Sequence, residues 1–347
     1  MKRFVTEFFV LPAYHGDCIL IKTFDPDNNE FIILIDGGTS QTFKYSLKKE
    51  LEDISYINIL ILTHIDSDHI AGLIAFFNST LINEIRIDEI WLNNPDMIEI
   101  DTGNLISVKQ GDTLKTLISQ KSPNSILRGI STEDGEIDKC GINFLILSPT
   151  PNILNTLYES WKSQSPESLL QNNIGISSVN DDYTKSLVEL SQIPFITDKG
   201  LNNDIFNASS IAFMLKCPDV SILLLADARP EIIEESLIYY GFNEQKPIVA
   251  DYVKISHHGS LNNTSQAMLS LIKSDNFIIS TNGGTANHRH PSRETIGRIV
   301  HNSNRSDQKL NIYFNYNIDD LRYRIGDFII DADLTNGNWD AEHRNNF

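Results

Sequence analysis

The chain has 347 residues, a formal net charge of −18 and 41% hydrophobic residues. This hydrophobic fraction can bury a substantial core, which excludes disorder of the whole chain. The negative charge opposes generic binding to phosphate backbones, since such binding depends on clustered Lys and Arg side chains. No apolar run approaches the length of a membrane span and the first residues make a poor secretory signal, so we expect a cytoplasmic protein without a membrane partner.

The amino-terminal region predicts three strands joined by polar turns. Apolar runs over 8–11 and 18–21 flank the turn His15-Gly16-Asp17, and a third apolar run covers 31–35. This third run ends in Asp36-Gly37-Gly38. The sequence therefore predicts a hairpin with a polar, glycine-rich tip.

The stretch Thr63-His64-Ile65-Asp66-Ser67-Asp68-His69 is the centre of the sequence. It follows a short apolar run over 57–62, which predicts a buried strand, and leads into an apolar segment over 70–77, which predicts a helix. Carboxylates and imidazoles so close together repel one another or lose hydration unless a cation compensates them. The motif therefore predicts a divalent metal site; the alternative is a solvated loop that happens to be rich in Asp and His.

The rest of the chain alternates strand and helix patterns. Beyond the motif we expect strands over 84–92, 142–148, 209–217, 221–226, 252–256 and 277–280. Helices are expected over about 105–120, 154–162, 183–191, 231–240, 265–272 and 294–300. A closing antiparallel pair is expected over 311–314 and 321–330, followed by a frayed polar tail from 336.

Polar groups that can bind metal follow the later strands as well. None of the nine histidines lies between His69 and His257, while Asp227 and the pair His257-His258 each follow a predicted strand. Because such strand ends can meet at one edge of a sheet, these side chains could surround a dinuclear site. The alternatives are that Asp227 caps the next helix and that the His-His pair belongs to a surface loop.

Taken in order, these motifs resemble those of the metallo-β-lactamase superfamily, in the variant carried by the hydrolase domain of ComEC-type competence proteins. The resemblance implies an α/β (α+β) fold, a four-layer αββα sandwich, as a single domain over 1–347. The family core has no counterpart of residues 152–203, which we interpret as a partly helical insertion: either a lid over the active site, or a passive elaboration or partner surface. The chain departs from the family's Gly-x-Gly-Asp turn by having Tyr14 in place of the first glycine.

The resemblance also implies a set of site residues. Two divalent ions would be held by His64, Asp66, Asp68, His69, Asp227 and His258, with His257 as an alternative to its neighbour. Residues expected to orient these ligands are Asp17, Asp36, Asn207 and Ser210, although the two aspartates could equally cap turns.

The predicted site is richer in oxygen than the common family pattern. Asp66 stands where many members have a histidine, and Asn207-Ala208-Ser209-Ser210 lies near the place of another histidine ligand. Because oxygen ligands favour harder ions, the expected metals widen from zinc to manganese, with magnesium as a further candidate.

The implied activity is hydrolysis by a water molecule that two metal ions activate. Asp66 or Asp68 would orient or deprotonate this water, and His290 would protonate the leaving oxygen. Lys254, Arg289 and Arg293 would contact the substrate; the alternative for the loop that holds His290 is a solvated capping loop.

The leading substrate class is a phosphodiester, in a nucleic acid or a nucleotide, because the resembled domain is associated with DNA degradation. A lactone, thioester or β-lactam is the second, favoured by the acidic composition. The non-enzymatic alternative is a metal-binding interaction module.

Overall fold

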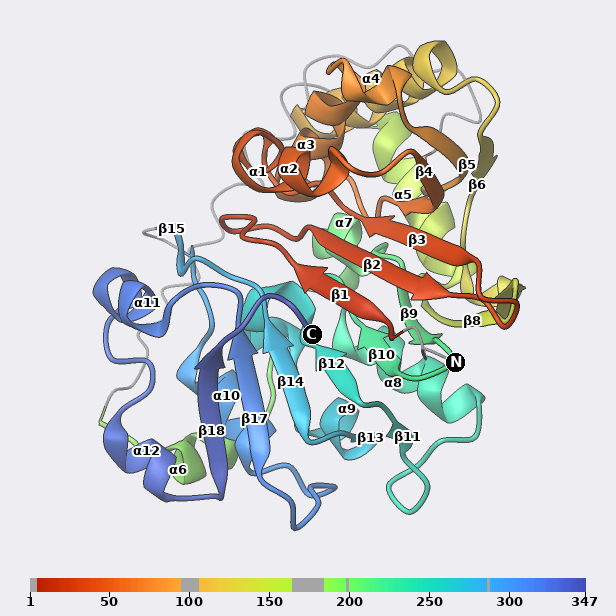
Figure 1. The fold of residues 1–347 in the computed structure, drawn as a ribbon. Helices are drawn as coiled ribbons and strands as arrows, with labels where there is room; N and C mark the ends of the chain where they lie inside the picture. The colour runs from red at the N-terminus through yellow and green to blue at the C-terminus, as the bar shows by residue number, and fades with distance from the viewer. Residues whose placement is uncertain (1–4, 95–105, 164–183, 198–199, 286–287) are drawn as a thin grey trace.

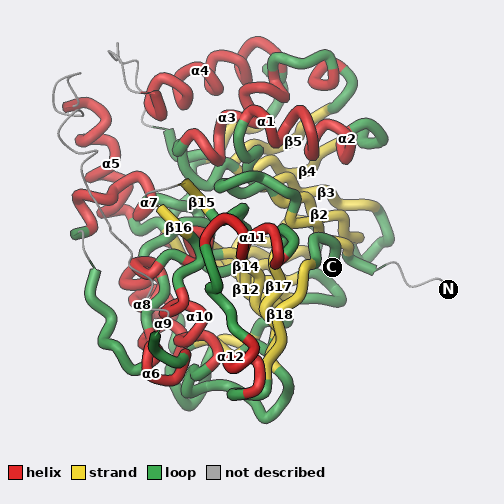
Figure 2. The backbone as a smooth tube through the Cα atoms, turned by 90° about the vertical axis from the view of Figure 1, so that its left-hand side faces the viewer, coloured by secondary structure: helices red, strands yellow, loops and turns green. Residues whose placement is uncertain are grey.

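The computed structural model describes residues 5–94, 106–163, 184–197, 200–285 and 288–347. Two β-sheets lie face to face, and helices cover the outer face of each (Figure 1). Figure 2, turned by 90°, shows the strands between the two helical layers. The predicted αββα sandwich is therefore confirmed.

The first sheet is built from the amino-terminal strands. Its order is β1-β2-β3-β4-β5-β6; the first two pairs are antiparallel and the other three are parallel. The strands are β1 (Glu7–Val10), β2 (Ile19–Phe24), β3 (Glu30–Ile35), β4 (Tyr56–Ile61), β5 (Arg86–Trp91) and β6 (Ile126–Arg128). Since β3 and β4 are parallel neighbours, the polar residues that follow them emerge at the same edge of this sheet.

The second sheet has the order β18-β17-β14-β12-β10-β9-β8-β7. Its strands are β7 (Glu136–Lys139), β8 (Ile142–Ser148), β9 (Ala212–Lys216), β10 (Ser221–Leu224), β12 (Tyr252–Lys254), β14 (Asn276–Ile279), β17 (Leu310–Phe314) and β18 (Trp339–His343). From β10 to β18 all neighbours are parallel. The residues after β10 and β12 therefore also share one edge.

Three apolar clusters hold the layers together. The cluster between the sheets includes Trp91, Phe144 and Phe213, and the rings of Trp91 and Phe144 meet edge to face at 4.9 Å. The other two clusters join each sheet to its own helices. Full burial of an aliphatic or aromatic side chain contributes about 1.5–3 kcal/mol, so these clusters supply the main drive for folding.

The helices divide between the two outer faces. Those packed on the first sheet are α1 (Ser40–Thr42), α2 (Lys48–Leu51), α3 (Ser67–Phe77), α4 (Ile106–Lys121), α5 (Pro151–Ser163) and α7 (Ile205–Ala208). A π-helical turn over Phe43–Leu47 joins α1 to α2. Those packed on the second sheet are α6 (Leu187–Ser191), α8 (Pro230–Tyr239), α9 (Gln266–Ser270), α10 (Arg293–Val300), α11 (Ile318–Ile325) and α12 (Asp331–Thr335). Within the described ranges, no helix has the length and apolar character of a membrane span.

Four short strands form two small ladders outside the main sheets. The parallel pair is β11 (Ile248–Val249) with β13 (Ile272–Lys273). The antiparallel pair is β15 (Gly284–Thr285) with β16 (His288–Arg289), which precedes His290.

Two predictions for the carboxyl-terminal part are wrong. Residues 321–330 were expected to pair with 311–314, yet residues 318–325 form α11 because Leu321 and Ile325 bury one face of a helix. The tail expected to fray instead contains β18, which pairs with β17 in parallel. The second sheet is thus completed by the last residues of the chain.

The segment over 152–203 is described at its two ends. Ile153 and Leu157 of α5 pack into the helical layer of the first sheet, whereas Leu187 and Leu190 of α6 pack into that of the second. Both described ends are therefore part of the sandwich. Residues 164–183 and 198–199 lie outside the described residues, so the expected lid stays a prediction.

The close approach of two glycines holds α3 against the end of β3. A Cβ atom on Gly72 would lie 1.8 Å from the carbonyl oxygen of Gly37. Only glycine, which has no Cβ atom, fits at this position. The amide of Gly37 donates to the carbonyl of His69, and the amide of Gly72 donates to the carbonyl of Gly38, both at 2.8 Å. The Asp-Gly-Gly tip thereby fixes the position of the motif of residues 63–69.

Candidate metal centre

The motif of residues 63–69 links β4 to α3 at the edge of the first sheet. Thr63 and His64 follow the strand, Asp66 precedes the first helical residue, and His69 lies in the first turn of the helix. Ile65 points into the core and is 3% exposed, so His64 and Asp66 project to the other side. The strand-to-helix transition thus presents the motif's polar side chains together.

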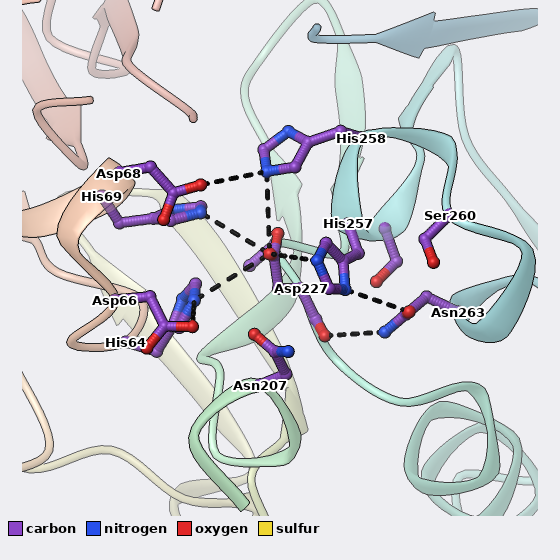
Figure 3. A network of polar contacts seen from close by, with 12 residues as sticks. His64, Asp66, Asp68, His69, Asn207, Asp227, His257, His258, Ser260 and Asn263 are labelled. Atoms are coloured by element: carbon purple, nitrogen blue, oxygen red, sulfur yellow. Dashed lines mark hydrogen bonds and ion pairs between the residues drawn. The ribbon is translucent and has the colours of Figure 1, made fainter. Parts of the chain in front are cut away.

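One oxygen atom, Oδ2 of Asp227, lies at the centre of the cluster in Figure 3. Its distance to Nε2 is 3.9 Å for His64, 3.6 Å for His69, and 3.7 Å for both His257 and His258. Two ligands of a tetrahedral ion, each about 2.1 Å from it, lie roughly 3.4 Å apart. The spacing is therefore close to that of ligands around a shared cation and longer than that of hydrogen bonds.

The remaining carboxylates divide the cluster into two groups that share Asp227. Oδ2 of Asp66 lies 3.7 Å from Nε2 of His64, while Oδ2 of Asp68 lies 3.8 Å from Nε2 of His258. His69 lies between the two groups, since its ligand atom is within 4.8 Å of those of His64 and Asp227 and also of those of Asp68 and His258. Two cations could be held here, one beside each group, with Asp227 within reach of both.

Each imidazole is held through its other nitrogen. Nδ1 of His69 lies 2.8 Å from Oδ2 of Asp36, and Nδ1 of His258 lies 2.9 Å from the carbonyl oxygen of Ser280. In a neutral ring both acceptors place the proton on Nδ1, which leaves the lone pair of Nε2 directed at the cluster. Despite burial, Asp227 and Asp36 raise the pKa of His69 well above its usual value, so a metal ion would have to displace the proton from its Nε2. His64 is held by the Thr63 hydroxyl at 3.1 Å and His257 by the Asn263 carboxamide oxygen at 3.0 Å.

The polar atoms that face the cluster fit a pair of cations. Among the described residues, the buried Nε2 atoms of His64, His69 and His258 and Oδ1 of Asp227 have no hydrogen-bond partner. Desolvation and the neighbouring Asp68 carboxylate raise the pKa of Asp66 to about 7. Burial and then His69 lower the pKa of His64 well below its usual value. Cations would stabilise the charged carboxylates and use the free imidazole lone pairs.

The structure brings both members of the His-His pair to Asp227. His257 and His258 adopt positive φ angles of 46° and 56°, an unfavourable conformation for residues with a Cβ atom, which turns both rings toward the site. His258 is buried and approaches Asp68, while the side chain of His257 is 27% exposed. Asp227 does not cap the next helix, since Arg229 occupies the N-cap position of α8.

Asp17 and Lys254 form a buried ion pair beneath the cluster. Lys254 Nζ contacts Oδ2 of Asp17, and both side chains are at most 2% exposed. Oδ1 of Asp17 lies 3.6 Å from Nδ1 of His258, so Asp17 lies against this ring. Lys254 was expected to contact the substrate; its burial in an ion pair points instead to a role in holding Asp17.

The predicted basic residues of the next loop differ in their surroundings. Arg293 was also expected to bind substrate, but its side chain is 1% exposed and contacts Asp333 at 2.8 Å, so the structure gives it a role in packing α10. Arg289 is exposed. The His290 ring is centred 5.6 Å from that of His257, at the rim of the cluster.

Asn207 and Ser210 lie at the amino-terminal side of β9. Asn207 is in α7, and its Nδ2 donates to Oδ1 of Asp204 at 2.8 Å. Ser210 is fully buried, and its amide donates to the carbonyl of Asn207 at 3.0 Å. Figure 3 shows Asn207 below Asp227, near His64 and Asp66.

Sequence reasoning missed residues that position the cluster through contacts distant in sequence. Thr63 donates to Asp36 through its amide and its hydroxyl, at 2.8 and 2.7 Å. Asn263 holds His257 and also donates to the carbonyl of Asp227 at 3.1 Å. Thr63 borders the motif and could have been noticed; Asn263 lies in a polar loop whose sequence carries no signal for this role.

Part of the chain matches a known protein family. Residues 11–157 match the family model described as "Metallo-beta-lactamase superfamily", and this segment includes the motif of residues 63–69. A search of curated proteins gives no match.

Among solved structures, the metallo-beta-lactamase fold protein YhfI from Bacillus subtilis is 10% identical, over 99% of this chain and 100% of that chain, with a TM-score of 0.39. Zn²⁺-bound PqqB from Methylobacterium extorquens is 11% identical, over 98% and 99%, with a TM-score of 0.44. A long form RNase Z from yeast is 14% identical, over 89% and 37%, with a TM-score of 0.36.

Proposed function

We infer that this protein is a metal-dependent hydrolase of the metallo-β-lactamase superfamily, and we propose that it cleaves phosphodiester bonds. The observation that carries the proposal is the position of Asp227, whose Oδ2 lies 3.6–3.9 Å from four imidazole nitrogens. Two divalent ions held there would supply Lewis-acid activation of water and of the bond under attack. We take His64 and Asp66 as ligands on one side of Asp227, and Asp68, His69 and His258 as ligands on the other.

The protein's own groups would then orient the reactants. Asp66 and Asp68 are the most exposed carboxylates of the cluster, at 34% and 21%, so they face the side from which water and substrate arrive. Either can accept a hydrogen bond from the attacking water. No side-chain nucleophile is required, because water itself attacks.

His290 is the proposed proton donor to the leaving oxygen. Its ring lies beside that of His257, and its backbone is fixed by the Thr281 hydroxyl, which donates to the His290 carbonyl at 3.2 Å. A histidine at the rim can reach the leaving group without occupying a metal position. General acid catalysis of this kind contributes about 10²–10⁴-fold to a rate.

The donor set supports a phosphodiester as the substrate. Three carboxylates, Asp66, Asp68 and Asp227, surround the site, so the ligand set is rich in oxygen and suits Mn²⁺ or Mg²⁺ as well as Zn²⁺. Such ions bind phosphate oxygens directly and can offset the negative charge of the chain near the site. A nucleic acid or nucleotide would therefore be held mainly by the cations.

One observation favours a second substrate class, a lactone, thioester or β-lactam. Of the three basic residues predicted to contact substrate, Lys254 and Arg293 are buried in ion pairs, and only Arg289 is exposed. A neutral substrate would not need a basic surface. A phosphodiester, which is negatively charged, would depend more on cationic side chains for binding than a neutral lactone, thioester or β-lactam would.

A direct test compares substrates on one preparation. Protein purified without chelator is analysed for metal and then incubated with Mn²⁺ or Zn²⁺ and with labelled single- and double-stranded DNA, RNA, cyclic dinucleotides and a lactone panel. We expect cleavage of phosphodiesters that is abolished by chelator and by Asp227→Asn. Cleavage of the lactones alone would replace the proposal with the second class, and metal binding without any hydrolysis would favour an interaction module.

A further inference from the structure

The carboxamide of Asn207 is held in one orientation by a chain of charged groups. Its Nδ2 donates to Oδ1 of Asp204 at 2.8 Å, and Oδ2 of Asp204 accepts from Arg229 at 2.9 Å. The Arg229 side chain is 1% exposed and also contacts Glu231 at 3.1 Å. Because a carboxylate paired with a guanidinium can only accept, the amide nitrogen of Asn207 must face Asp204.

The other end of this carboxamide faces the metal centre. Oδ1 of Asn207 is buried and has no hydrogen-bond partner among the described residues. Figure 3 shows this oxygen on the side of His64 and Asp66, below Asp227. An unpaired buried carbonyl costs about 1–3 kcal/mol, and a contact with a cation at this place would offset that cost.

We propose that Oδ1 of Asn207 binds the cation held by His64 and Asp66, so that the two cation positions differ in chemistry. This inference rests on the proposed dinuclear centre. The first position would have one nitrogen ligand, His64, and three oxygen ligands, Asp66, Asn207 and the shared Asp227. The residue expected only to orient ligands is thereby assigned as a ligand itself.

The second position has a softer ligand set. We assign to it two nitrogens, from His69 and His258, and two oxygens, from Asp68 and Asp227; His69 also lies within 4.8 Å of ligand atoms of His64 and Asp227, so its place in this set is part of the proposal. His257 is counted in neither set. In the described part of the chain, Asp227 is the one carboxylate whose oxygen lies within 4 Å of its Nε2. Oxygen ligands favour Mn²⁺ and Mg²⁺ while imidazole suits Zn²⁺, so the first position selects the harder ion.

The experiment measures metal binding rather than catalysis. Wild-type protein, Asn207→Ala, Asn207→Asp and Asn203→Ala are stripped of metal, titrated with Mn²⁺ against a competing chelator, and counted for bound ions. Asn203→Ala is the matched control, since Asn203 is exposed in the turn before α7. We expect wild type and Asn203→Ala to bind two ions, and Asn207→Ala to lose at least about 10–100-fold affinity at one position.

Asn207→Asp separates a ligand from a structural residue. It keeps an oxygen toward the cluster but loses the amide donor to Asp204, so we expect it to bind two ions although the metal-free protein unfolds more readily. If Asn207 only supports α7, this variant will be as impaired in ion binding as Asn207→Ala. Unchanged affinity at both positions in Asn207→Ala would also overturn the inference.

The outcomes also distinguish this inference from the proposed function. Wild type that binds two ions and cleaves no phosphodiester contradicts the function alone. Wild type that cleaves phosphodiesters while Asn207→Ala binds both ions normally contradicts the assignment of Asn207 alone. Wild type that binds no cation contradicts both.

Discussion

Asp36 accepts a hydrogen bond from Nδ1 of His69 at 2.8 Å, and Nε2 of the same ring lies 3.6 Å from Oδ2 of Asp227. The same carboxylate accepts from the amide and the hydroxyl of Thr63. Asp36 is fully buried at the tip of β3, so it joins the end of this strand to the motif after β4. The contact fixes the orientation of the His69 ring and places a proton on its Nδ1.

Asp36→Asn should weaken metal binding without abolishing the fold. One carboxylate oxygen becomes an amide that faces a donor, either the Thr63 amide or the His69 ring, and an unsatisfied buried group costs about 1–3 kcal/mol. Loss of such a supporting contact typically lowers metal affinity about 10–100-fold. Chelator competition measures the affinity, with Asp25→Asn in the exposed turn after β2 as the control; equal affinities in both variants would contradict the prediction.

Asp66 should make the metal-free protein less stable above neutral pH. Desolvation and Asp68 raise its pKa to about 7, whereas a carboxyl in an unfolded chain titrates near 3.9. The folded state therefore takes up the proton first as pH falls, and wild type gains stability from about pH 8 down to pH 4. Asp66→Asn should be more stable than wild type at pH 8, with a difference that narrows toward pH 5.

Urea unfolding of chelator-treated protein at several pH values measures this effect. A difference between Asp66→Asn and wild type that stays constant with pH would show that the pKa of Asp66 is not raised in the folded protein. A difference that widens as pH falls would show that it is lowered.

Gly16→Ala should disturb the metal centre through the backbone. A Cβ atom at this position would lie 1.7 Å from the carbonyl oxygen of Asp68, so the turn and the start of α3 would have to separate. Overpacking of this kind costs about 1–3 kcal/mol, and we expect metal affinity to fall as well. Gly200→Ala is the control, because nothing lies within 4 Å of the added atom. Thermal unfolding and metal titration of both variants would decide the matter, and a Gly16→Ala protein as stable as the control would refute it.

The Asp17–Lys254 pair should act as a unit in stability. Removing one partner leaves the other charge buried and unpaired, which lowers the free energy of unfolding by about 3–5 kcal/mol. We expect a similar loss for Asp17→Asn and for Lys254→Met. The double variant should be less destabilised than the sum of the two single variants, since it buries no unpaired charge. Urea unfolding of the metal-free proteins measures this coupling. If Lys254→Met has normal stability and a raised KM, Lys254 contacts the substrate, as the sequence predicted, and does not hold Asp17.

His290→Gln should slow cleavage most for poor leaving groups. A proton donor matters when the leaving oxygen is basic, so we expect kcat to fall about 10²-fold or more on a dinucleotide and little on a nitrophenyl ester. His343→Gln, exposed on β18, is the control. Equal losses on both substrates would point to a structural role of His290.

Much of the fold follows from local pattern, because the strands around the motif are short apolar runs bounded by turn residues. Asp227 and His258 could be placed near each other because parallel neighbours end at one edge, whereas their contact with the motif after β4 joins two different sheets. Contacts such as Lys254 with Asp17 could not be predicted, since they join segments 237 residues apart. A lysine at a strand end gives no sign of whether it faces substrate or a buried carboxylate.

The error at residues 321–330 has a physical explanation. Leu321, Tyr323 and Ile325 alternate as a strand would, but Leu321 and Ile325 also have helical spacing, and Tyr323 is 93% exposed in α11. Asn317 caps this helix by accepting from the amide of Asp319 at 2.8 Å, a signal that outweighed the alternation.

The strand β18 was missed because its polar residues form an exposed edge. Its register with β17 is set by distant pairing, such as Leu310 with Trp339. Phe347, near its end, stacks on Phe8 of β1 at 4.7 Å between ring centroids. The polar pattern of residues 339–343 alone does not indicate that this segment pairs with β17.

The metal-facing groups come from opposite leaves of the sandwich, with Asp66 and His69 from one and Asp227 and His258 from the other. Cations at this seam would tie the leaves together, and ligand at 100 times its dissociation constant adds about 2.7 kcal/mol to the free energy of unfolding. Resistance to proteases, and with it the steady-state abundance of the protein in a cell, would then rise with the supply of the metal.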